Sequence, residues 1–405
     1  MLVTIDILFL LLSFVSVYFL VLFFMIFVLE RKNIRSLPEM KTLPFVSVII
    51  PAYNKEKFIS GTVEAVKNLD YPKNLMEIIV VDDGSKDGTC EILKKISGIR
   101  FFSKPNGGRS DAINFGMEKA KGEILACVDA DSYPEKESLK KAVRFFEDRD
   151  VAGVTVSVLV KNANNLMQKL QRVEYALLVL SRKLMERLNA IYVTPGPMAL
   201  YRKNALKELG GFDTKNMTED IEIAWRLLSN GCKIRMSIDS KVYTDVPDTF
   251  GKWWHQRIRW NVGGAQTAIK YFGYFFKTPS NVGKFLLPLF TLSYALTLLG
   301  LAMFFYLASA AAYNFVFVFL KSGLMGADMF RFSFVFAPDI LILLGGFAFV
   351  VSMLWLKLSL GALDSGISVR NALPEFLVYL LFYIAVHPFN LIDSTWKLLR
   401  KNYTW

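Results

Sequence analysis

Two aspartates separated by a single residue are the strongest candidates for chemistry in this chain. Asp129 and Asp131 follow residues 124–128, a short apolar run with the composition of a buried strand. Side chains two positions apart at a strand end project to the same side. Two carboxylates so placed suit Mg²⁺ or Mn²⁺ shared with a diphosphate, whose charge the metal neutralises. A solvated turn that holds two acids by chance explains the same residues.

A second acidic pair, Asp82 and Asp83, stands between the apolar residues 78–81 and a glycine-rich turn. Two adjacent acids repel a bare diphosphate, so a nucleobase or a ribose is their more suitable ligand. The alternative is structural, because acids before a turn can cap the helix that we expect from Thr89 onward.

A cation stands at the end of a flexible loop, where Arg109 follows Asn106, Gly107 and Gly108 and precedes an expected helix. The backbone N–H groups of such a loop, together with a guanidinium group, can bind an anion. An ordinary surface loop is the alternative, and the local residues favour neither interpretation.

Thr218, Glu219 and Asp220 begin a segment with the apolar spacing of a helix. Thr218 as the N-cap, with two acids in the first turn, is a complete structural explanation. A catalytic carboxylate at Asp220 fits the same position, because the N-termini of helices often face ligands. The local sequence does not separate these two interpretations.

Tryptophans and cations alternate in residues 252–260, which contain Trp253, Trp254 and Trp260. A protein core would not hold so many cations, so one interpretation is a helix at a membrane interface, anchored by its aromatic residues. Tryptophan is also suited to stacking on the face of a sugar, and Arg259 is suited to binding a diphosphate. Both interpretations can hold at once.

The order of the apolar runs predicts the fold of residues 44–250. Short β-rich runs at residues 46–50, 78–81 and 124–128 alternate with segments of helical spacing. This alternation predicts an α/β, Rossmann-like domain with a parallel sheet, in which ligands bind beyond the carboxyl ends of the strands. We expect helices at residues 58–69, 89–96, 112–119 and 164–188, the last of them packed on the domain core or lying on a membrane.

Long uncharged runs on both sides of this domain predict membrane spans. Residues 7–29 contain no charge and are long enough to cross a bilayer core of about 30 Å. This run lacks a basic n-region and a small-residue cleavage site, so we expect an anchor that is retained. The later candidate spans are residues 285–320, 340–356 and 376–392.

Basic residues set the expected orientation in the cell membrane. The first span is followed by Arg31, Lys32, Arg35 and Lys41, so the positive-inside rule places the domain at residues 44–250 of this multi-pass chain in the cytoplasm. Three later spans would put the basic C-terminal tail outside, against the same rule. Either residues 285–320 contain a second short or re-entrant span, or the final apolar run lies along the membrane interface.

Composition narrows the range of partners. The net charge is +12 and 53% of the residues are hydrophobic, which favours membrane lipid headgroups and an anionic nucleotide-sugar over nucleic acid. Cys90, Cys127 and Cys232 are far apart, which fits a reducing compartment and argues against structural zinc. The chain has 2 histidines, too few for a histidine-rich metal site.

Taken together, these motifs resemble those of family 2 glycosyltransferases with the GT-A fold. Within that family they resemble the membrane-embedded branch that includes cellulose, chitin, hyaluronan and poly-N-acetylglucosamine synthases. The resemblance covers residues 46–260, including residues 51–56 at the end of the first expected strand and residues 210–213 before the acidic helix. The expected divisions are an anchor at 1–35, a catalytic domain at 44–250, an interfacial region at 251–280 and a membrane region at 284–405.

The resemblance also implies roles for single residues. Asp82 and Asp83 would contact the uridine, Asp129 and Asp131 would hold the diphosphate and its metal, and Asp220 would be the general base. The remaining implied substrate contacts are Arg109, Gln256, Arg259 and Trp260 for the diphosphate and the acceptor, and Gly196 in the Pro-Gly-Pro loop that borders the acceptor.

The sequence therefore predicts a metal-dependent, inverting transfer of a sugar from a UDP-sugar to a growing polysaccharide. Asp220 would take the proton of the acceptor hydroxyl, which attacks the anomeric carbon. Two features depart from the family pattern: Arg109 stands in place of the usual lysine, and the last membrane region is compact for a polysaccharide channel. One alternative is a glycolipid synthase that adds one or a few sugars to a membrane lipid. Another is a non-catalytic membrane scaffold on the same fold. The presence of Asp129, Asp131 and Asp220 argues against this alternative, since a protein that has lost its activity usually loses such acids first.

Overall fold

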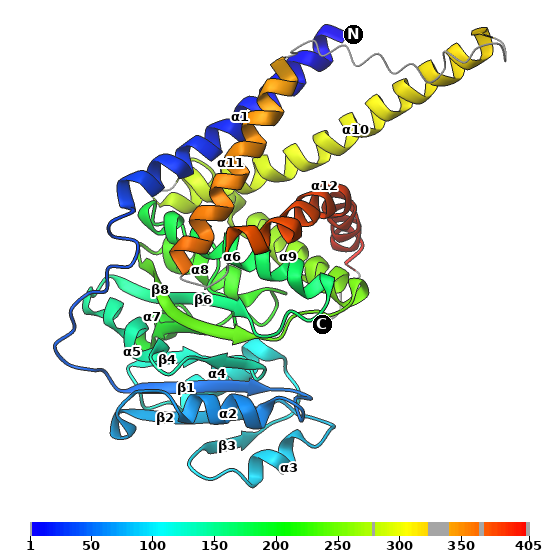
Figure 1. Ribbon diagram of the computed structural model, residues 1–405. Helices are drawn as coiled ribbons and strands as arrows, with labels where there is room; N and C mark the ends of the chain where they lie inside the picture. Colours follow the sequence, from blue (N-terminus) through cyan, green and yellow to red (C-terminus); the bar gives the residue numbers. More distant parts are fainter. Residues whose placement is uncertain (1, 278–279, 323–339, 364–367, 402–405) are drawn as a thin grey trace. The chain divides into compact units, whose positions relative to one another are not determined.

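The computed structural model describes residues 2–277, 280–322, 340–363 and 368–401 (Figure 1). The chain forms two compact units. One unit consists of Met1–Phe24 with Leu289–Trp355, and the other consists of Met25–Pro288 with Leu356–Trp405. The second, larger unit contains every candidate site residue.

An eight-stranded sheet organises the larger unit. Its strands are β1 (Val46–Ala52), β2 (Met76–Asp82), β3 (Arg100–Ser103), β4 (Ile124–Cys127), β5 (Ser132–Pro134), β6 (Val151–Val160), β7 (Ala199–Arg202) and β8 (Lys233–Thr244). They lie in the order β3-β2-β1-β4-β7-β6-β8-β5. β1 to β4 are parallel, as are β6 and β8, whereas β7 is antiparallel to β4 and β6, and β5 is antiparallel to β8.

The prediction of a parallel sheet is confirmed for β1 to β4 but is wrong for the complete sheet, in which β5 and β7 are antiparallel to their neighbours. The three expected strands are present as β1, β2 and β4, and they belong to the parallel half. The alternation of strand and helix on which the prediction rested is interrupted after β4, because β5 follows it without a helix between them. Beyond it, the long connection between β6 and β7 lets the chain return in the opposite direction, so the sheet is mixed.

The helices of the larger unit include the four that the sequence predicts, and every end of these four lies within three residues of the expected one. The helices that lie wholly within the larger unit are α2 (Ile59–Lys67), α3 (Thr89–Lys94), α4 (Arg109–Lys119), α5 (Ser138–Val143), α6 (Leu166–Arg187), α7 (Lys203–Glu208), α8 (Glu219–Ser229), α9 (Phe250–Tyr271) and α12 (Val369–Leu399). Short turns of 3-10 helix lie at Lys73–Leu75, Arg144–Glu147 and Phe272–Tyr274, and a π-helical stretch lies at Val282–Leu286.

α4 begins at Arg109, three residues earlier than expected. The residue before it, Gly108, has a φ of 90°, a conformation that glycine adopts without steric cost. The loop therefore turns directly into the helix. Arg109 is carried by a rigid element and not by the flexible loop that the sequence suggests.

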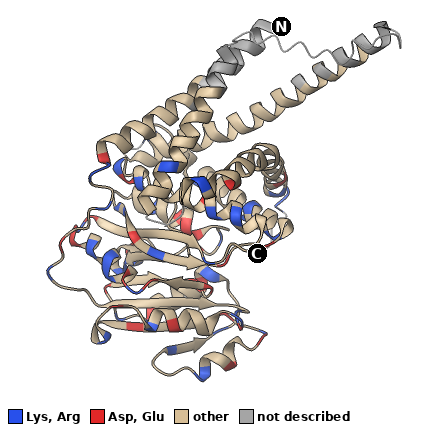
Figure 2. Cartoon of the chain, viewed as in Figure 1, with Lys and Arg blue, Asp and Glu red and all other residues tan. Residues whose placement is uncertain are grey.

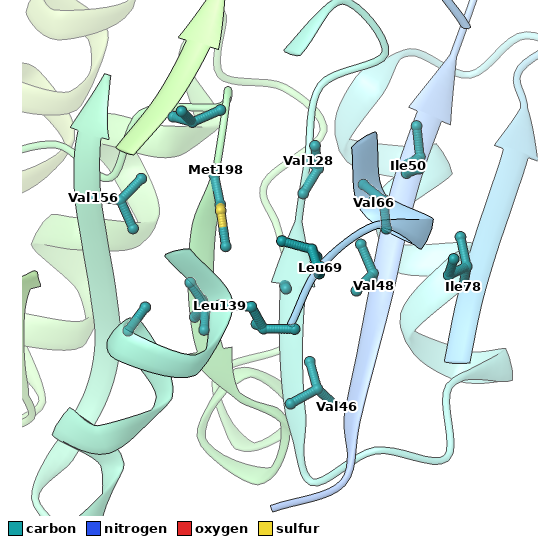
Figure 3. Close-up of a cluster of buried hydrophobic side chains, with 14 of the residues drawn as sticks. Val46, Val48, Ile50, Val66, Leu69, Ile78, Val128, Leu139, Val156 and Met198 are labelled. Carbon is teal, nitrogen blue, oxygen red and sulfur yellow. The ribbon is translucent and has the colours of Figure 1, made fainter. Parts of the chain in front are cut away.

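Apolar side chains between β1 and α2 hold the parallel half together (Figure 3). Val48 and Ile50 of β1 are at most 1% exposed, and so are Ile59, Val63 and Val66 of α2. Burying one such side chain contributes about 1.5–3 kcal/mol. The apolar face expected for this helix is confirmed, and it fixes the strand whose neighbours carry the acidic pairs.

α6 packs against β6 and β8 and also contacts α12. Its leucine stripe is buried at Leu170, Leu180 and Leu184. A capping box fixes its start, because the Asn165 side chain accepts the backbone N–H of Gln168 and the Gln168 side chain accepts the backbone N–H of Asn165. The expectation that this helix packs on the domain core is confirmed.

Three further helices are apolar along most of their length: α1 (Leu2–Glu30), α10 (Leu287–Ser322) and α11 (Ile340–Leu363). Charged residues gather on the sheet and its helices, whereas the described parts of α10 and α11 are almost free of them (Figure 2). By length and composition, the described helices able to cross a membrane are Val282–Ala310, Gly346–Leu363 and Val369–Leu399, with a shorter apolar stretch at Val17–Glu30. These helices indicate a membrane protein.

Candidate active site

Arg109 and Asp129 form the centre of a charged cluster beyond the carboxyl end of β4. Asp129 lies two residues after Cys127, the last residue of β4. Its Oδ1 accepts a hydrogen bond from Arg109 Nε at 2.7 Å and lies 2.6 Å from Arg109 Nη2. Arg109 Nη1 also donates to Glu219 Oε1, at the start of α8. One planar guanidinium group thus joins carboxylates from two separate elements, which suits arginine better than lysine.

The charges of this cluster compensate one another inside the protein. Glu219 is 5% exposed, and a buried carboxylate requires a cationic partner. Burial by itself lowers the pKa of Arg109, but Asp129 and Glu219 outweigh this effect and raise that pKa well above its usual value. Arg109 therefore remains a cation throughout the physiological pH range.

Asp220 follows Glu219 and faces the same cluster. Part of its surface is accessible, although protein atoms enclose it closely on its other sides. Burial raises the pKa of Asp220 to about 7, and the negative charge of Glu219 adds to this rise, whereas Arg109 and Arg259 oppose it. Since a general base works best with a pKa near the operating pH, this carboxylate has the electrostatic properties of one.

The turn before Asp220, at Met217 and Thr218, is in contact with α9. Thr218 is the N-cap residue of α8, but its side chain makes no capping hydrogen bond, so the capping explanation is wrong for this residue. Instead, the backbone N–H of Met217 donates to Gln266 Oε1 of α9 at 3.0 Å. A Cβ added at Gly263 of α9 would lie 2.1 Å from the Thr218 hydroxyl oxygen. This close approach requires a glycine and ties the two motifs together.

Asp131 has a different cation from Asp129. Lys55 Nζ lies 2.5 Å from Asp131 Oδ2, and the two side chains are 33% and 25% exposed. Lys55 follows β1 within the segment of residues 51–56. The two aspartates of the expected metal motif are therefore both at the same end of the sheet, but each is paired with its own basic residue.

Gly196 is packed against the centre of the cluster. Its carbonyl oxygen accepts a hydrogen bond from Arg109 Nη2 at 3.3 Å. A Cβ added at Gly196 would lie 2.5 Å from Asp129 Oδ2 and 2.7 Å from Arg109 Nη2. A residue with a side chain at this position would displace the carboxylate or the guanidinium group, so the expected Pro-Gly-Pro loop borders the cluster closely.

Asp83 is buried and bonded on both of its oxygens. Oδ1 accepts from Lys104 Nζ at 2.7 Å and from the backbone N–H of Gly107 at 3.0 Å, and Oδ2 accepts from the backbone N–H of Gly108 at 2.7 Å. The loop that the sequence indicates as an anion site does bind an anion. That anion is the protein's own carboxylate, whereas Arg109 points to Asp129.

Asp82 is also bonded within the protein. Its two oxygens accept the backbone N–H of Ser85 at 3.2 Å and the hydroxyl of Ser103 at 3.0 Å. At the start of the helix, the backbone N–H and the hydroxyl of Thr89 both donate to Asp87 Oδ1. The alternative interpretation, in which the acidic pair caps this helix, is therefore wrong.

α9 carries Gln256, Arg259 and Trp260 in unlike surroundings. Arg259 is exposed, yet its charge acts on Asp220. Trp260 is partly buried against the core, with the guanidinium carbon of Arg257 4.0 Å from its ring centroid. Gln256 Oε1 is buried and accepts no hydrogen bond from the described part of the chain. An unpaired buried carbonyl oxygen is available to a donor group on a ligand.

The residues expected to bind a metal fit a cation that is shared with a substrate. The Asp129 and Asp131 side chains are 26% and 25% exposed, so their hard oxygen atoms are accessible. The described residues contain no group of three or more His, Cys, Asp or Glu that could hold a metal ion. A divalent cation would therefore need diphosphate or water oxygens to complete its ligands, which suits a substrate metal better than a structural one.

Three residues of this region were not among the predicted contacts: Lys55, Lys104 and Glu219. Glu219 was visible within its acidic motif but was not separated from its neighbour. Lys55 stands in the segment at the end of the first strand. Lys104 has no local signal, since its pairing with Asp83 at 2.7 Å depends on the sheet order.

Comparisons with known proteins agree with this geometry. Residues 47–210 match the family described as Glycosyl transferase family 2. A poly-β-1,6-N-acetyl-D-glucosamine synthase of Staphylococcus epidermidis is 31% identical over 269 residues, which are 64% of this chain and 65% of that synthase, just under two thirds of its length. The probable glycosyltransferase YdaM of Bacillus subtilis is 32% identical over 285 residues, 68% of each chain.

A solved structure shows the same fold. A mannosyltransferase from Pyrobaculum calidifontis, in complex with GDP-mannose and Mn²⁺, has a TM-score of 0.57 and 19% sequence identity, covering 97% of this chain and 100% of that one. The GT-A-like α/β fold expected from the sequence is confirmed. Glycosyltransferases with this fold typically depend on a divalent cation and use nucleotide-sugar donors.

Proposed function

Because the chain belongs to glycosyltransferase family 2, we propose that it transfers a sugar with inversion from a UDP-sugar to a growing polysaccharide. The observation that carries this proposal is the position of Asp220. It is a partly accessible carboxylate with a pKa of about 7, in the electrostatic field of Arg109 and Arg259. This arrangement combines a base for the acceptor hydroxyl with cations suited to a diphosphate.

In the proposed reaction, Asp220 accepts the proton of an acceptor hydroxyl as the hydroxyl oxygen forms a bond to the anomeric carbon. The bond between that carbon and the diphosphate oxygen breaks, and UDP leaves with the electron pair. Arg259, exposed on α9, and Arg109 stabilise the developing negative charge. Attack opposite to the leaving group inverts the anomeric centre.

Asp129 and Asp131 are the proposed metal ligands. A bound Mg²⁺ or Mn²⁺ would neutralise negative charge on the leaving diphosphate. For Asp131 to bind the metal, Lys55 would exchange its ion pair for a substrate phosphate or for solvent. Excess chelator should therefore abolish turnover, and Asp131→Asn should weaken both the metal dependence and nucleotide binding.

Asp82 and Asp83 are proposed to organise the nucleoside end of the donor site. Their oxygens are bonded within the protein, so contact with the uracil or the ribose requires the exchange of a bond such as that from Lys104. The name of the similar synthase supports an N-acetylglucosamine donor and a polymeric product. Gln256 and Trp260 are the proposed contacts of the acceptor, Gln256 through its unpaired carbonyl oxygen.

The proposed site faces the cytoplasm, where UDP-sugars are made. The basic residues after α1, namely Arg31, Lys32, Arg35 and Lys41, support this orientation. Membrane lipids would surround the apolar helices. Protease added to intact cells should leave residues 46–260 uncut, and cleavage there would reverse the orientation.

Product size is the decisive test of the proposal. The purified chain in lipid vesicles is incubated with single labelled UDP-sugars, with and without Mg²⁺ or Mn²⁺, and Asp220→Asn is the matched inactive control. Long chains that depend on the metal and on Asp220 are expected with one of the donors. Products of one or two sugars that partition into organic solvent would identify a glycolipid synthase instead. If no donor releases UDP, the protein is a scaffold.

A further inference from the structure

The last helix, α12, combines two properties that conflict. Val369–Leu399 is long and apolar enough to cross a membrane. Yet Leu356–Trp405, which contains this helix, belongs to the same compact unit as the sheet, and α12 contacts α6 and α9 (Figure 1). The helix includes Pro374 and Pro388, so it is also irregular in its interior.

Polar contacts tie α12 to the sheet unit along most of its length. Near its start, both oxygens of Glu375 accept from Arg172 Nη2 of α6, at 2.8 and 2.7 Å. In the middle, the Tyr383 hydroxyl donates to the buried Glu174 of α6, which also pairs with Arg257 of α9.

The C-terminal third of α12 is bonded to α9. Asn390 is fully buried, and its Nδ2 donates to the Trp254 carbonyl oxygen at 3.1 Å. Trp254 Nε1 in turn donates to Asp393 Oδ2 at 2.9 Å. Asn261 Nδ2 donates to Asn390 Oδ1 at 3.0 Å and lies 3.4 Å from Ser394 Oγ. These bonds would be lost if the helix separated from α9.

The part of α12 that is bonded to α6 and α9 runs from Glu375 to Ser394, and this length is incompatible with α12 crossing the membrane by itself. An α-helix rises about 29 Å between Glu375 and Ser394, which is close to the roughly 30 Å thickness of a bilayer core. If α12 crossed the core, α6 and α9 would have to accompany it through the hydrocarbon. α6 packs on the sheet and carries the Arg172–Glu375 ion pair, in which the arginine is 34% exposed. An exposed ion pair in hydrocarbon is strongly unfavourable.

The opposite face of α12 is apolar and exposed. Leu381, Ile384 and Leu399 are 71%, 73% and 74% exposed, and Leu377 and Ile392 are 37% and 47% exposed. Their spacing places all five on one helical face, whereas the bonded residues lie on the other. In water, such a continuous apolar face would need a cover.

A shallow apolar cavity, widely open to the outside, continues this face onto α9. Its volume is about 520 Å³, and its walls come from the start of α9 and the second half of α12. The lining residues are Phe250, Gly251, Trp254, Ala385, Val386 and Phe389. A cavity with these walls accepts a hydrocarbon chain and offers few partners to a polar ligand.

We propose that α12 lies along the membrane surface, with its apolar face in the acyl chains of the lipids and its polar face bonded to α6 and α9. The occupant of the apolar face and of the cavity is therefore lipid. Exposed Arg370, Arg400 and Lys401 at the two ends of the helix suit anionic headgroups. The basic tail then lies on the same side as the sheet, in agreement with the positive-inside rule. This inference does not depend on which sugar is transferred.

The first test locates the two ends of α12. Arg370→Cys and Lys401→Cys are made separately in the full chain, in cells, and labelled with a membrane-impermeant maleimide before and after permeabilisation. Peptide mass spectrometry measures the extent of labelling at each introduced thiol and compares it with that of the native Cys90, which is partly exposed and lies in the same unit as the sheet. Both introduced thiols should behave like Cys90. Labelling of the two thiols from opposite sides overturns the proposal, and α12 is then a span.

The second test measures depth. Leu377→Cys, Ile384→Cys and Ile392→Cys carry an environment-sensitive fluorophore in vesicles of phosphatidylcholine and phosphatidylglycerol, with spin labels at shallow or deep acyl positions. All three should be quenched more strongly by the shallow label, and Lys41→Cys, in an exposed segment outside the helices, should not be quenched. Strongest quenching of position 384 by the deep label indicates a span. No quenching at any of the three positions means that protein covers the face. Either result overturns the proposal.

Discussion

Two acidic pairs stand on either side of β1, at the ends of β2 and β4, and the protein treats them differently. Asp82 and Asp83 at the β2 edge are buried, with the Asp83 side chain 4% exposed, and every one of their carboxylate oxygens accepts a hydrogen bond from the protein. Asp129 and Asp131 at the β4 edge are 26% and 25% exposed, and each is held by a single basic side chain.

The same residue pattern, two acids after a strand, therefore has a structural role at one edge of β1 and leaves side chains accessible to a ligand at the other. A buried carboxylate whose bonds are all made orders the loop around it, because breaking those bonds costs free energy. A partly exposed carboxylate with one cation can exchange that cation for a ligand. We therefore expect substitutions at the β4 edge to change the reaction, and substitutions at the β2 edge to change the stability of the fold first.

Asp220→Asn is expected to have the largest effect. Asparagine is nearly the same size but accepts no proton, so kcat should fall by roughly 10²–10⁴-fold. Binding of the UDP-sugar should be close to that of the wild type, and the melting temperature at neutral pH should be no lower, because the neutral amide avoids the cost of a buried charge. Calorimetry with UDP and a thermal melt check these two controls. A variant that loses donor binding and stability together, but is normally active per folded molecule, would show that Asp220 is a structural residue.

The pH dependence of the rate is the next largest effect. The carboxylate form of Asp220 is the base, and its pKa is about 7. The value of kcat/KM should therefore rise about tenfold per pH unit up to that pKa and level off above it. A profile that is flat between pH 5 and 8, measured in the range where the protein stays folded, contradicts this assignment.

The same group affects stability in the opposite sense. Its pKa is raised from 3.8 in the unfolded chain, so the folded state binds the extra proton between these two values. Its contribution to the free energy of unfolding should therefore decrease as the pH rises from about 4 to about 7. Asp220→Asn should remove this part of the slope.

Gly196→Ala tests how closely the β4 edge is packed. The added methyl group meets Asp129 at 2.5 Å and Arg109 at 2.7 Å. If the strain of about 1–3 kcal/mol is borne in the active arrangement, kcat/KM should fall roughly fivefold to 150-fold. Gly273→Ala is the matched control, because nothing lies within 4 Å of its added Cβ. Equal activity of the two variants would mean that the cluster relaxes without cost.

Asp83→Asn should have the smallest effect on turnover and a clear effect on stability. The substitution removes the ion pair with Lys104 and one of the acceptors for the backbone N–H groups of the loop. The free energy of unfolding should fall by about 1–3 kcal/mol. Asp70→Asn is the control, since its pair with Lys140 is exposed and should contribute less than about 1 kcal/mol. A large loss of kcat without a loss of stability would erase the contrast between the two edges.

Local pattern was sufficient for the elements of the parallel half. β1, β2, β4 and α2 have continuous apolar runs or a single apolar face, and these follow directly from burial. The reversed direction of β7 was out of reach. Direction in a sheet depends on where a long connection returns, and residues 161–198 carry no residue pattern that specifies it.

The candidate site divides in the same way. Asp129, Asp131 and Asp220 were identified from residue type, spacing and family resemblance. Lys55 and Glu219 acquire their significance only when the chain folds, because their partners Asp131 and Arg109 are distant in sequence. A side-chain cap from Thr218 was one of two interpretations that the local sequence left open, and the structure shows no such bond but a close approach of Gly263 from α9.

The chemical types of the site residues, the parallel half of the sheet and the apolar segments could all be predicted from the sequence, because each depends on neighbours along the chain. The tertiary structure was needed to show which carboxylates are buried and fully hydrogen-bonded, which are partly exposed, and that α12 is bonded to α6 and α9. Exposure and pairing arise between residues far apart in sequence: Arg109 meets Glu219, and Asn390 meets Trp254. An apolar composition permits a helix to cross a bilayer, but the polar contacts of its other face decide whether it is free to do so.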